Sequence, residues 1–334
     1  MAEKLILSSA PFLKDGESTP KIMYKVILSL VPIVFASIYY FGLSALAIIF
    51  VSVFSCMFTE WLFNPKGKDK IKSLKDGSAL ITGLLLALTL PPGFPLWMVF
   101  LGGVVSIGMG KVIWGGLGQN IFNPALLGRA FLQAAFPISI TTWSPPDGRY
   151  FGFRGTNLAM PMYQGESVDA VTGATPLSSM KFDKVGTNLF DLLLGNTGGS
   201  LGETCGILII LSAIYLLSTK LINYRIPLSI ILSLSIFSGI FYLISPDQYP
   251  SPMFMILSGG MLIGTFYMAT DLVTSPLTPR GCWIFGASIG ILIVLIRNWG
   301  GLPEGVMYAI LLMNSATPLI NKYTKIRTYG HTKR

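Results

Sequence analysis

Ten apolar segments divide this chain, and the polar stretches between them are short except at one place. The hydrophobic positions form continuous runs, and roughly 17 to 25 apolar residues are enough for a helix to cross a bilayer. Shorter runs broken by Gly or Pro can lie at membrane depth inside the protein. The first five segments are 23–41, 43–63, 78–90, 96–110 and 123–137, and the second five are 201–217, 226–243, 254–269, 282–296 and 305–319.

This pattern predicts an all-α polytopic membrane protein with about ten transmembrane helices. The composition agrees, because a soluble globular chain of 334 residues is not 52% hydrophobic and only 12% charged. The first apolar run is long enough to span, so we expect no cleavable signal peptide. The expected order is an N-terminal segment (1–22), helices one to five (23–137), a hydrophilic loop (138–200), helices six to ten (201–319) and a basic tail (320–334).

Lysine and arginine predict the orientation, because cytoplasmic connections carry an excess of them. Most of the 24 basic residues lie before segment one, in alternate connections and in the tail. With ten spans, both termini are expected to be cytoplasmic and 138–200 to lie outside the membrane. The net charge of +9 then reflects topology and contact with anionic membrane lipid. No nucleic-acid partner is expected, because the basic residues are not interleaved with exposed aromatic residues.

Five segments on each side of one loop suggest two five-helix repeats, and an odd number per half makes such repeats inverted in the membrane. Trp114-Gly115-Gly116-Leu117 follows the fourth segment, and Trp299-Gly300-Gly301-Leu302 follows the ninth. Each half also has a small-residue-rich segment followed by a proline-bearing turn, at 89–93 and at 270–276. Inverted repeats with short, Gly-rich spans are also found in channels and transporters, so that class stays open.

Short or broken spans at corresponding positions point to a buried site, and three polar residues lie next to them. Asn120 and Asn123 are three residues apart at the start of segment five, where one helical turn places both amides on one face. Asp271 ends segment eight on the same predicted side of the membrane. These groups are suited to hydrogen-bonding a flat heterocycle, whereas the alternative is simple helix capping and a hydrated terminus.

Arg129 lies within segment five, where a charge costs roughly 2.5 to 3.5 kcal/mol on insertion scales and is a functional candidate. The alternative is that its side chain snorkels to the interface, which is about 9 Å away along a helix.

The hydrophilic loop is too long for a simple connection, because connections beyond about 15 residues are usually functional or disordered. It contains seven aromatic residues that offer surface for a ring system, namely Trp143, Tyr150, Phe151, Phe153, Tyr163, Phe182 and Phe190. Residues 169–175 read Asp-Ala-Val-Thr-Gly-Ala-Thr, and Pro176 follows. Small neighbours leave the Thr175 hydroxyl open to approach, although the pattern alone is also that of a Thr-Gly turn.

The sequence lacks the residues that several kinds of catalytic and metal site require. The only histidine is His331, and Cys56, Cys205 and Cys282 are far apart, so a Ser-His-Asp triad, a histidine zinc site and an iron–sulfur cluster held by this chain alone are disfavoured. A cluster shared with a partner through Cys205 or Cys282 stays open. No Walker loop is present, so ATP is not expected to drive the protein directly.

Three stretches together resemble one family. Residues 169–175 are similar to the [DE]-x-x-[ST]-G-A-[TS] motif at which flavin mononucleotide (FMN) is joined to the last hydroxyl by a phosphoester bond. Residues 119–131 and 268–271 resemble further signatures of the same family. This is the RnfD/NqrB family of membrane proteins, from the Rnf electron-transport complex and the sodium-pumping NADH:quinone reductase. The chain is short at its N-terminus, which favours the Rnf branch.

The resemblance implies roles for individual residues. Thr175 would carry covalent FMN, and Asp169, Thr172, Gly173 and Ala174 would complete the motif that a separate flavin transferase recognises. Asn120, Asn123 and Asp271 match residues around a non-covalent riboflavin in the quinone-reductase branch.

As a member of the Rnf branch, the chain would work with the A, B, C, E and G proteins of the complex in a bacterial or archaeal cytoplasmic (inner) membrane. Its two flavins would pass electrons across the membrane layer between ferredoxin and NAD, coupled to Na⁺ or H⁺ translocation. A flavin-independent channel or transporter, and a scaffold whose loop only docks a partner, are the alternatives.

Overall fold

The computed structural model describes residues 18–63, 73–146, 148, 150–161, 173–195, 197–203 and 205–325, and its regular elements in those ranges are all helices. Every one of the ten predicted apolar segments is helical. The first half contains α1 (Thr19–Phe41), α2 (Leu43–Phe63), α4 (Ser78–Leu88), α5 (Leu96–Ile107) continued by the π-helix η1 (Gly108–Val112), and α6 (Pro124–Ala135).

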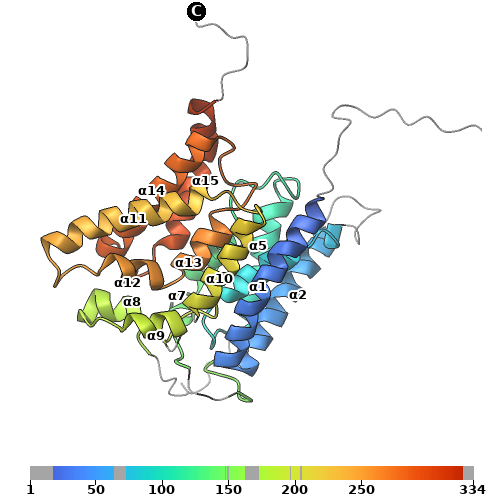
Figure 1. Cartoon of the computed structure of the whole chain (residues 1–334). Coiled ribbons are helices and arrows are strands. Elements are labelled where there is room, and N and C mark those ends of the chain that lie inside the picture. Colours follow the sequence, from blue (N-terminus) through green and yellow to red (C-terminus); the bar gives the residue numbers. More distant parts are fainter. Residues whose placement is uncertain are drawn as a thin grey trace, which may run out of the picture.

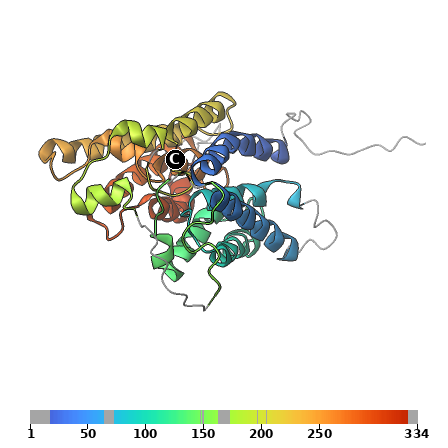
Figure 2. The same ribbon diagram turned by 90° about the horizontal axis from the view of Figure 1, so that it is seen from below.

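The second half has the same number of apolar segments. It contains α10 (Gly206–Ser218), α11 (Arg225–Ile244), α12 (Pro252–Leu257) with α13 (Met261–Ile263) and the π-helix η3 (Gly264–Met268), α14 (Pro279–Trp299) and α15 (Val306–Tyr323). Between the halves lie α7 (Pro137–Ile140), α8 (Pro176–Ser178), the π-helix η2 (Ser179–Asp183) and α9 (Leu189–Leu194). Figures 1 and 2 show α1 and α2 on one side of the molecule and α11 and α14 on the other.

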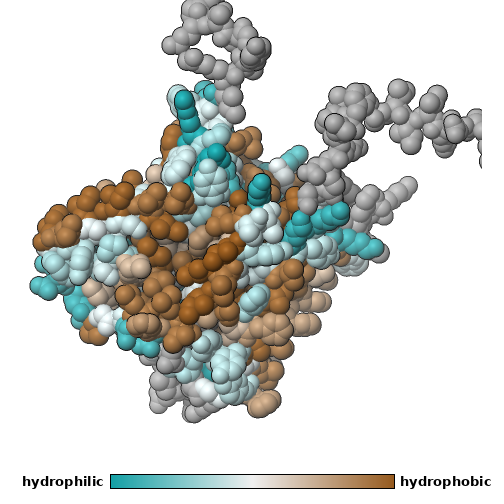
Figure 3. All heavy atoms as spheres, in the orientation of Figure 1, coloured by the Kyte–Doolittle hydropathy of each residue, from teal (hydrophilic) through white to brown (hydrophobic). Residues whose placement is uncertain are grey.

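Four described helices are long and apolar enough to cross a membrane, namely α1, α2, α11 and α14. α4, α10 and α5 with η1 are shorter apolar helices. Figure 3 shows apolar side chains covering most of one face, with hydrophilic ones gathered toward its margins. The structure therefore confirms a helical protein of the polytopic membrane type, while the number of ten spans, the inverted relation of the halves and the orientation stay predictions.

Helix packing follows a corresponding order in the two halves. In the first, α2 packs on α4 and α5, and α5 packs on α6; in the second, α11 packs on α12 and α14, and α14 packs on α15. Glycine permits the same close approach in each half. A methyl group at Gly103 of α5 would come within 2.5 Å of Ser55 Oγ on α2, and one at Gly290 of α14 within 2.0 Å of Ser233 Oγ on α11.

The eighth segment is not one continuous helix, and our prediction of a single span over 254–269 is wrong in this respect. The backbone leaves the helix at Ser258 and turns at Gly259, whose φ is +65° and therefore favours glycine. Arg297 of α14 makes this break possible, because its guanidinium donates to the carbonyls of Met255 at 2.5 Å and Ser258 at 2.9 Å. A broken helix at this depth needs such partners for its freed backbone groups.

The described part of the loop between the halves packs against the ends of α1 and α4. Arg154 donates to the carbonyls of Pro145 at 2.7 Å and Tyr40 at 3.2 Å. Asn157 donates to the carbonyls of Pro92 and Phe94, both at 3.1 Å. These buried contacts fix the loop over one end of the helices, whereas the first turn of α1 lies at the other end.

Candidate functional site

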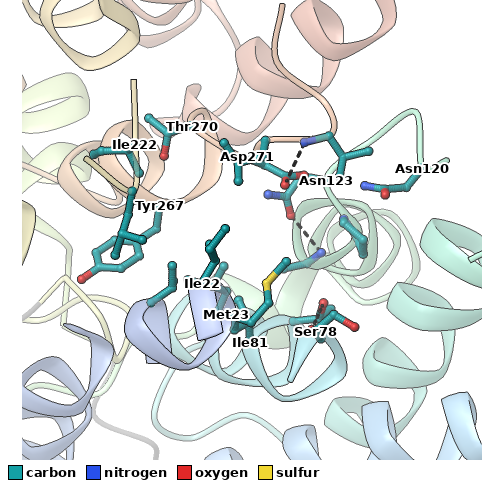
Figure 4. Close-up of a pocket in the computed structure, with 18 of the residues that line it drawn as sticks. Ile22, Met23, Ser78, Ile81, Asn120, Asn123, Ile222, Tyr267, Thr270 and Asp271 are labelled. Atoms are coloured by element: carbon teal, nitrogen blue, oxygen red, sulfur yellow. Dashed lines mark hydrogen bonds between the residues drawn. The ribbon is translucent and has the colours of Figure 1, made fainter. Parts of the chain in front are cut away.

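The first candidate site, the Asn123 pocket, lies between the two halves near the first turn of α1. It has about 890 Å³ of space between its atoms, part of it open to solvent. Its walls are mainly apolar. The structure brings all three predicted polar residues to this pocket, and Figure 4 shows Asn120, Asn123 and Asp271 above Met23, Ser78 and Ile81.

Asn123 joins the halves across this pocket. Its Oδ1 accepts from the backbone N–H groups of Ala125 at 3.0 Å and Leu126 at 3.4 Å, so it is the N-cap of α6. Its Nδ2 donates to the carbonyl of Met268 in η3, at 3.2 Å. The capping interpretation of Asn123 is therefore correct, and the same side chain also lines the pocket.

Asn120 reaches the pocket in a different way from the one predicted. It lies before α6, because Pro124 occupies the first helical position and holds the preceding residue in an extended conformation. The prediction that one helical turn joins Asn120 and Asn123 is wrong, although both amides line the same pocket. Asn120 is 7% exposed and its side chain hydrogen-bonds to Asp271.

Asp271 is a half-buried carboxylate at the end of η3. Desolvation raises its pKa, and hydrogen bonds from the Val273 N–H, the Thr274 hydroxyl and Asn120 oppose that shift. The carboxylate is therefore not the freely hydrated helix terminus of the alternative interpretation. It is an oriented acceptor at the edge of a mostly apolar pocket.

The second candidate site, the Thr175 pocket, lies at the loop end of the helices. It has about 1170 Å³ of space, part of it open, and is lined by Gly173, Ala174 and Thr175 together with residues of α6, α15 and the connection before α15. Trp143 and Phe182, two of the seven loop aromatics, line it as well. Phe151 is 95% exposed and Phe190 71% exposed, so these two do not bury a ring system within this chain.

Thr175 is 6% exposed, and its hydroxyl is less open than its small neighbours suggested. Its Oγ1 caps α8 by accepting from the Ser178 N–H at 3.2 Å, and it lies 2.9 Å from Ser178 Oγ. An ester oxygen keeps lone pairs, so the cap is compatible with a phosphoester at this oxygen. Asp169 and Thr172 of the heptad lie outside the described residues.

Lys181 in η2 ties this segment to the second half. Its ammonium donates to the carbonyls of Gly300 at 2.5 Å and Leu302 at 2.9 Å, both in the second Trp-Gly-Gly-Leu stretch. Burial, and then the charge of Lys184, lower the pKa of Lys181. The contact holds the Thr175 segment against the connection between α14 and α15.

Arg129 does not snorkel to the interface. It is 5% exposed and forms an ion pair with Glu304, which precedes α15 in the other half. Both residues line the Thr175 pocket. A smaller cavity behind it is lined by Arg129 and Glu304 as well, and by Glu203 and Met268. This smaller cavity thus extends from the Thr175 pocket to Met268, whose carbonyl accepts a hydrogen bond from Asn123.

Our sequence interpretation missed Glu203, Arg297 and Glu304, and it counted Lys111 only as a loop charge. Lys111 is 4% exposed within η1, where it forms an ion pair with Glu60 at 2.7 Å and donates to Ser78 Oγ at 2.5 Å. One sequence signal could have identified these four residues. A charged residue inside or at the end of an apolar segment is a functional candidate, whether its charge is positive or negative.

Comparison with known proteins agrees with these features. Residues 6–330 match the model of the NQR2, RnfD, RnfE family. The chain belongs to this family. It is 40% identical to the D subunit of the proton-translocating ferredoxin:NAD(+) oxidoreductase complex of Clostridium ljungdahlii, over 97% of this chain and 96% of that protein. It is 37% identical to the D subunit of the ion-translocating oxidoreductase complex of Yersinia pseudotuberculosis (97% and 98%) and 35% identical to that of Escherichia coli O127:H6 (98% and 99%).

Proposed function

We propose that the chain is the D subunit of an Rnf-type ion-translocating ferredoxin:NAD oxidoreductase complex and carries two flavins. FMN would be bound to Thr175 through a phosphoester, and riboflavin would occupy the Asn123 pocket. The observation that carries the proposal is the presence of two pockets at different ends of the helices, one beside the loop between the halves and the other at the first turn of α1. One contains the Thr175 hydroxyl and the other contains Asn120, Asn123 and Asp271.

The residues of the Thr175 pocket fit an attached flavin. Trp143, Phe182 and Tyr308 supply aromatic surface, and Arg129 and Gln133 supply polar groups. Gly173, which has no side chain, and Ala174, which has only a methyl group, border the pocket beside the hydroxyl. The Thr175 hydroxyl, held as the cap of α8, would form the bond to the phosphate. Lys181 would keep this segment in place by its hydrogen bonds to the connection before α15.

The Asn123 pocket fits an uncharged flavin. Its apolar walls come from α1, α4 and the end of α10, and Asn120, Asn123 and Asp271 together offer donors and acceptors for one edge of a ring system. Asp271 disfavours a phosphate there, because two negative charges in a poorly hydrated site repel each other. Asn123 would hold the two halves together around the ligand through its bond to the Met268 carbonyl.

A bound flavin supplies one- and two-electron transfer, and the protein tunes it by position, hydrogen bonds and nearby charge. This chain's own residues would fix two such groups on either side of an apolar layer and keep water away from the path between them. The names of the relatives support ion translocation in the complex as a whole, and the coupling ion would be Na⁺ or H⁺. The A, B, C, E and G proteins of the complex and a flavin transferase would be its partners.

The deciding experiment is in-gel ultraviolet fluorescence of the denatured chain, produced together with a flavin transferase. We expect fluorescence in the parent chain and in Thr175→Ser, which keeps a hydroxyl, and none in Thr175→Ala. Intact mass should show one FMN, less one water, in the fluorescent proteins only.

A dark parent band, with the transferase active on a control protein, would refute covalent attachment. Solute uptake by that flavin-free chain in liposomes would then support the transporter alternative.

A further inference from the structure

Four charged side chains, two buried arginines and two half-buried glutamates, form a cluster between the two halves beside the Thr175 pocket. Arg129 comes from α6, Arg297 from α14, Glu203 precedes α10 and Glu304 precedes α15. Arg129 and Arg297 are 5% and 3% exposed. We call these four residues the charge cluster. In the proposed function, the charge cluster has no role other than that Arg129 and Glu304 line the Thr175 pocket.

The two carboxyl groups of the charge cluster line the same small cavity behind the Thr175 pocket and face the same turn at Gly259 and Gly260. Two ionised carboxylates have only acceptors to offer each other. A hydrogen bond between them therefore requires one proton on the pair. Glu203 Oε1 is buried, and no N–H or hydroxyl donor of the described residues reaches it. The other oxygen, Oε2, accepts from the Ser200 N–H at 3.3 Å.

The broken helix brings the cluster together. A methyl group built on Gly259 would lie 3.1 Å from Arg297 Nη2 and 3.7 Å from Glu304 Oε1. One built on Gly260 would lie 3.5 Å from Glu203 Oε1. Three of the four charged groups thus surround one Gly-Gly turn, and side chains larger than hydrogen there would push them apart.

The charges that face the carboxyl pair set its proton content. Arg129 binds Glu304 from α6, and the Arg297 guanidinium faces the pair from α14 while donating to two carbonyls. Tyr308 of α15 interacts with both Arg129 and Glu304. With one shared proton the cluster has a net charge of +1, and without it the net charge is zero. Both states are tolerable in a poorly hydrated site, since neither leaves a carboxylate without a cation.

We propose that Glu203 and Glu304 share one proton and form a proton-exchanging site for the Thr175 pocket. With FMN attached to Thr175 and an electron supplied by a one-electron donor, the pair would be the source of one proton that balances the added negative charge. Arg129 and Arg297 would then neutralise the two carboxylates, and the pair would take the proton back when the electron is passed on. The electron transfer rests on the proposed function, whereas the proton on the pair does not.

The proton can be detected without flavin, by infrared spectroscopy of the Thr175→Ala chain in detergent. At neutral pH we expect a carbonyl stretch from a protonated carboxyl group, lost in Glu203→Gln and in Glu304→Gln. Asp247→Asn, which removes an exposed acid of the connection between α11 and α12, should leave it unchanged. An equal band in the parent and both glutamine variants would overturn the shared proton. Glu203→Asp, which keeps a carboxyl group, should shift the band instead of removing it and shows that the site still folds.

The exchange is measured on the flavinylated chain, with dithionite as reductant. The midpoint potential of the covalent flavin should fall as pH rises across the neutral range, and this dependence should weaken in Glu203→Gln. The same pH dependence in parent and variant would overturn the exchange. If the chain carries no FMN at all, the proposed function fails while the infrared result still decides whether the pair holds a proton.

Discussion

Replacing Asn123 tests both the contact between the halves and the first pocket. Asn123→Ala removes the cap of α6, which typically costs about 0.5 to 2 kcal/mol. It also leaves the Met268 carbonyl without the Asn123 donor in a buried position, which costs roughly 1 to 3 kcal/mol. We expect a total loss of roughly 1.5 to 5 kcal/mol. At about 2 °C per kcal/mol for a large chain, the apparent Tm should fall by about 3 to 10 °C.

Asn188→Ala is the matched control. Asn188 is also an N-cap, since its Oδ1 accepts from the Phe190 N–H at 3.2 Å, but it is exposed and makes its cap far from the Asn123 pocket. It should lose about 1 kcal/mol or less. Thermal unfolding in detergent can be followed with a thiol-reactive dye, because Cys56 and Cys282 are 0% and 1% exposed and react only when the helices separate.

The two variants should also differ in bound riboflavin, measured by extraction and chromatography on a Thr175→Ala background. Asn123→Ala should release it, and Asn188→Ala should retain it. Equal Tm values for the two variants would refute the role of Asn123 in joining the halves. Full riboflavin content in Asn123→Ala would refute its role as a ligand.

Three further predictions follow from single contacts. Gly259→Ala should destabilise the chain by roughly 1 to 3 kcal/mol, because φ is +65° and the new methyl meets Arg297; an unchanged Tm would contradict this. Thr175→Ala should lower the Tm by about 1 to 4 °C relative to Thr175→Ser in flavin-free protein, because it removes the cap of α8, and only the serine variant should accept FMN. Desolvation raises the Asp271 pKa, so the parent should lose stability relative to Asp271→Asn as pH rises from about 4 through that pKa. A constant difference in Tm between these two proteins across that range would contradict the shift.

Continuous hydrophobic runs were enough to place the helices. The predicted bounds of α2 are those of the structure, and α11 differs by one residue at each end. Helix ends were less predictable where proline or glycine decides them. Pro124 starts α6 after Asn123, and Gly259 interrupts the eighth segment, because these residues restrict or release the backbone in ways that average hydropathy does not register.

Some residues of the candidate sites could also be predicted from the sequence, whereas others could not. Asn120, Asn123 and Asp271 were brought together correctly, since their apolar neighbours and the predicted topology place them at one end of the helices. The partners of Arg129 could not be predicted, because Glu304 is 175 residues away and approaches only when the two halves pack. Glu203 and Arg297 were missed for the same reason, as each is an ordinary charge near a segment end until the broken helix surrounds it.

The predicted inverted repeat would account for the presence of two pockets, one beside each Trp-Gly-Gly-Leu stretch. Leu117 of the first Trp-Gly-Gly-Leu stretch lines the Asn123 pocket, and Leu302 of the second lines the Thr175 pocket. A buried cation comes shortly before each stretch, Lys111 in the first half and Arg297 in the second. Lys111 bonds to the start of α4, while Arg297 bonds to the break after α12, which is the corresponding element of its half. If one half is turned over relative to the other, repeating the same arrangement of cation, Trp-Gly-Gly-Leu stretch and short helix would produce one pocket toward each membrane face. That is the placement that the proposed electron transfer across the layer requires.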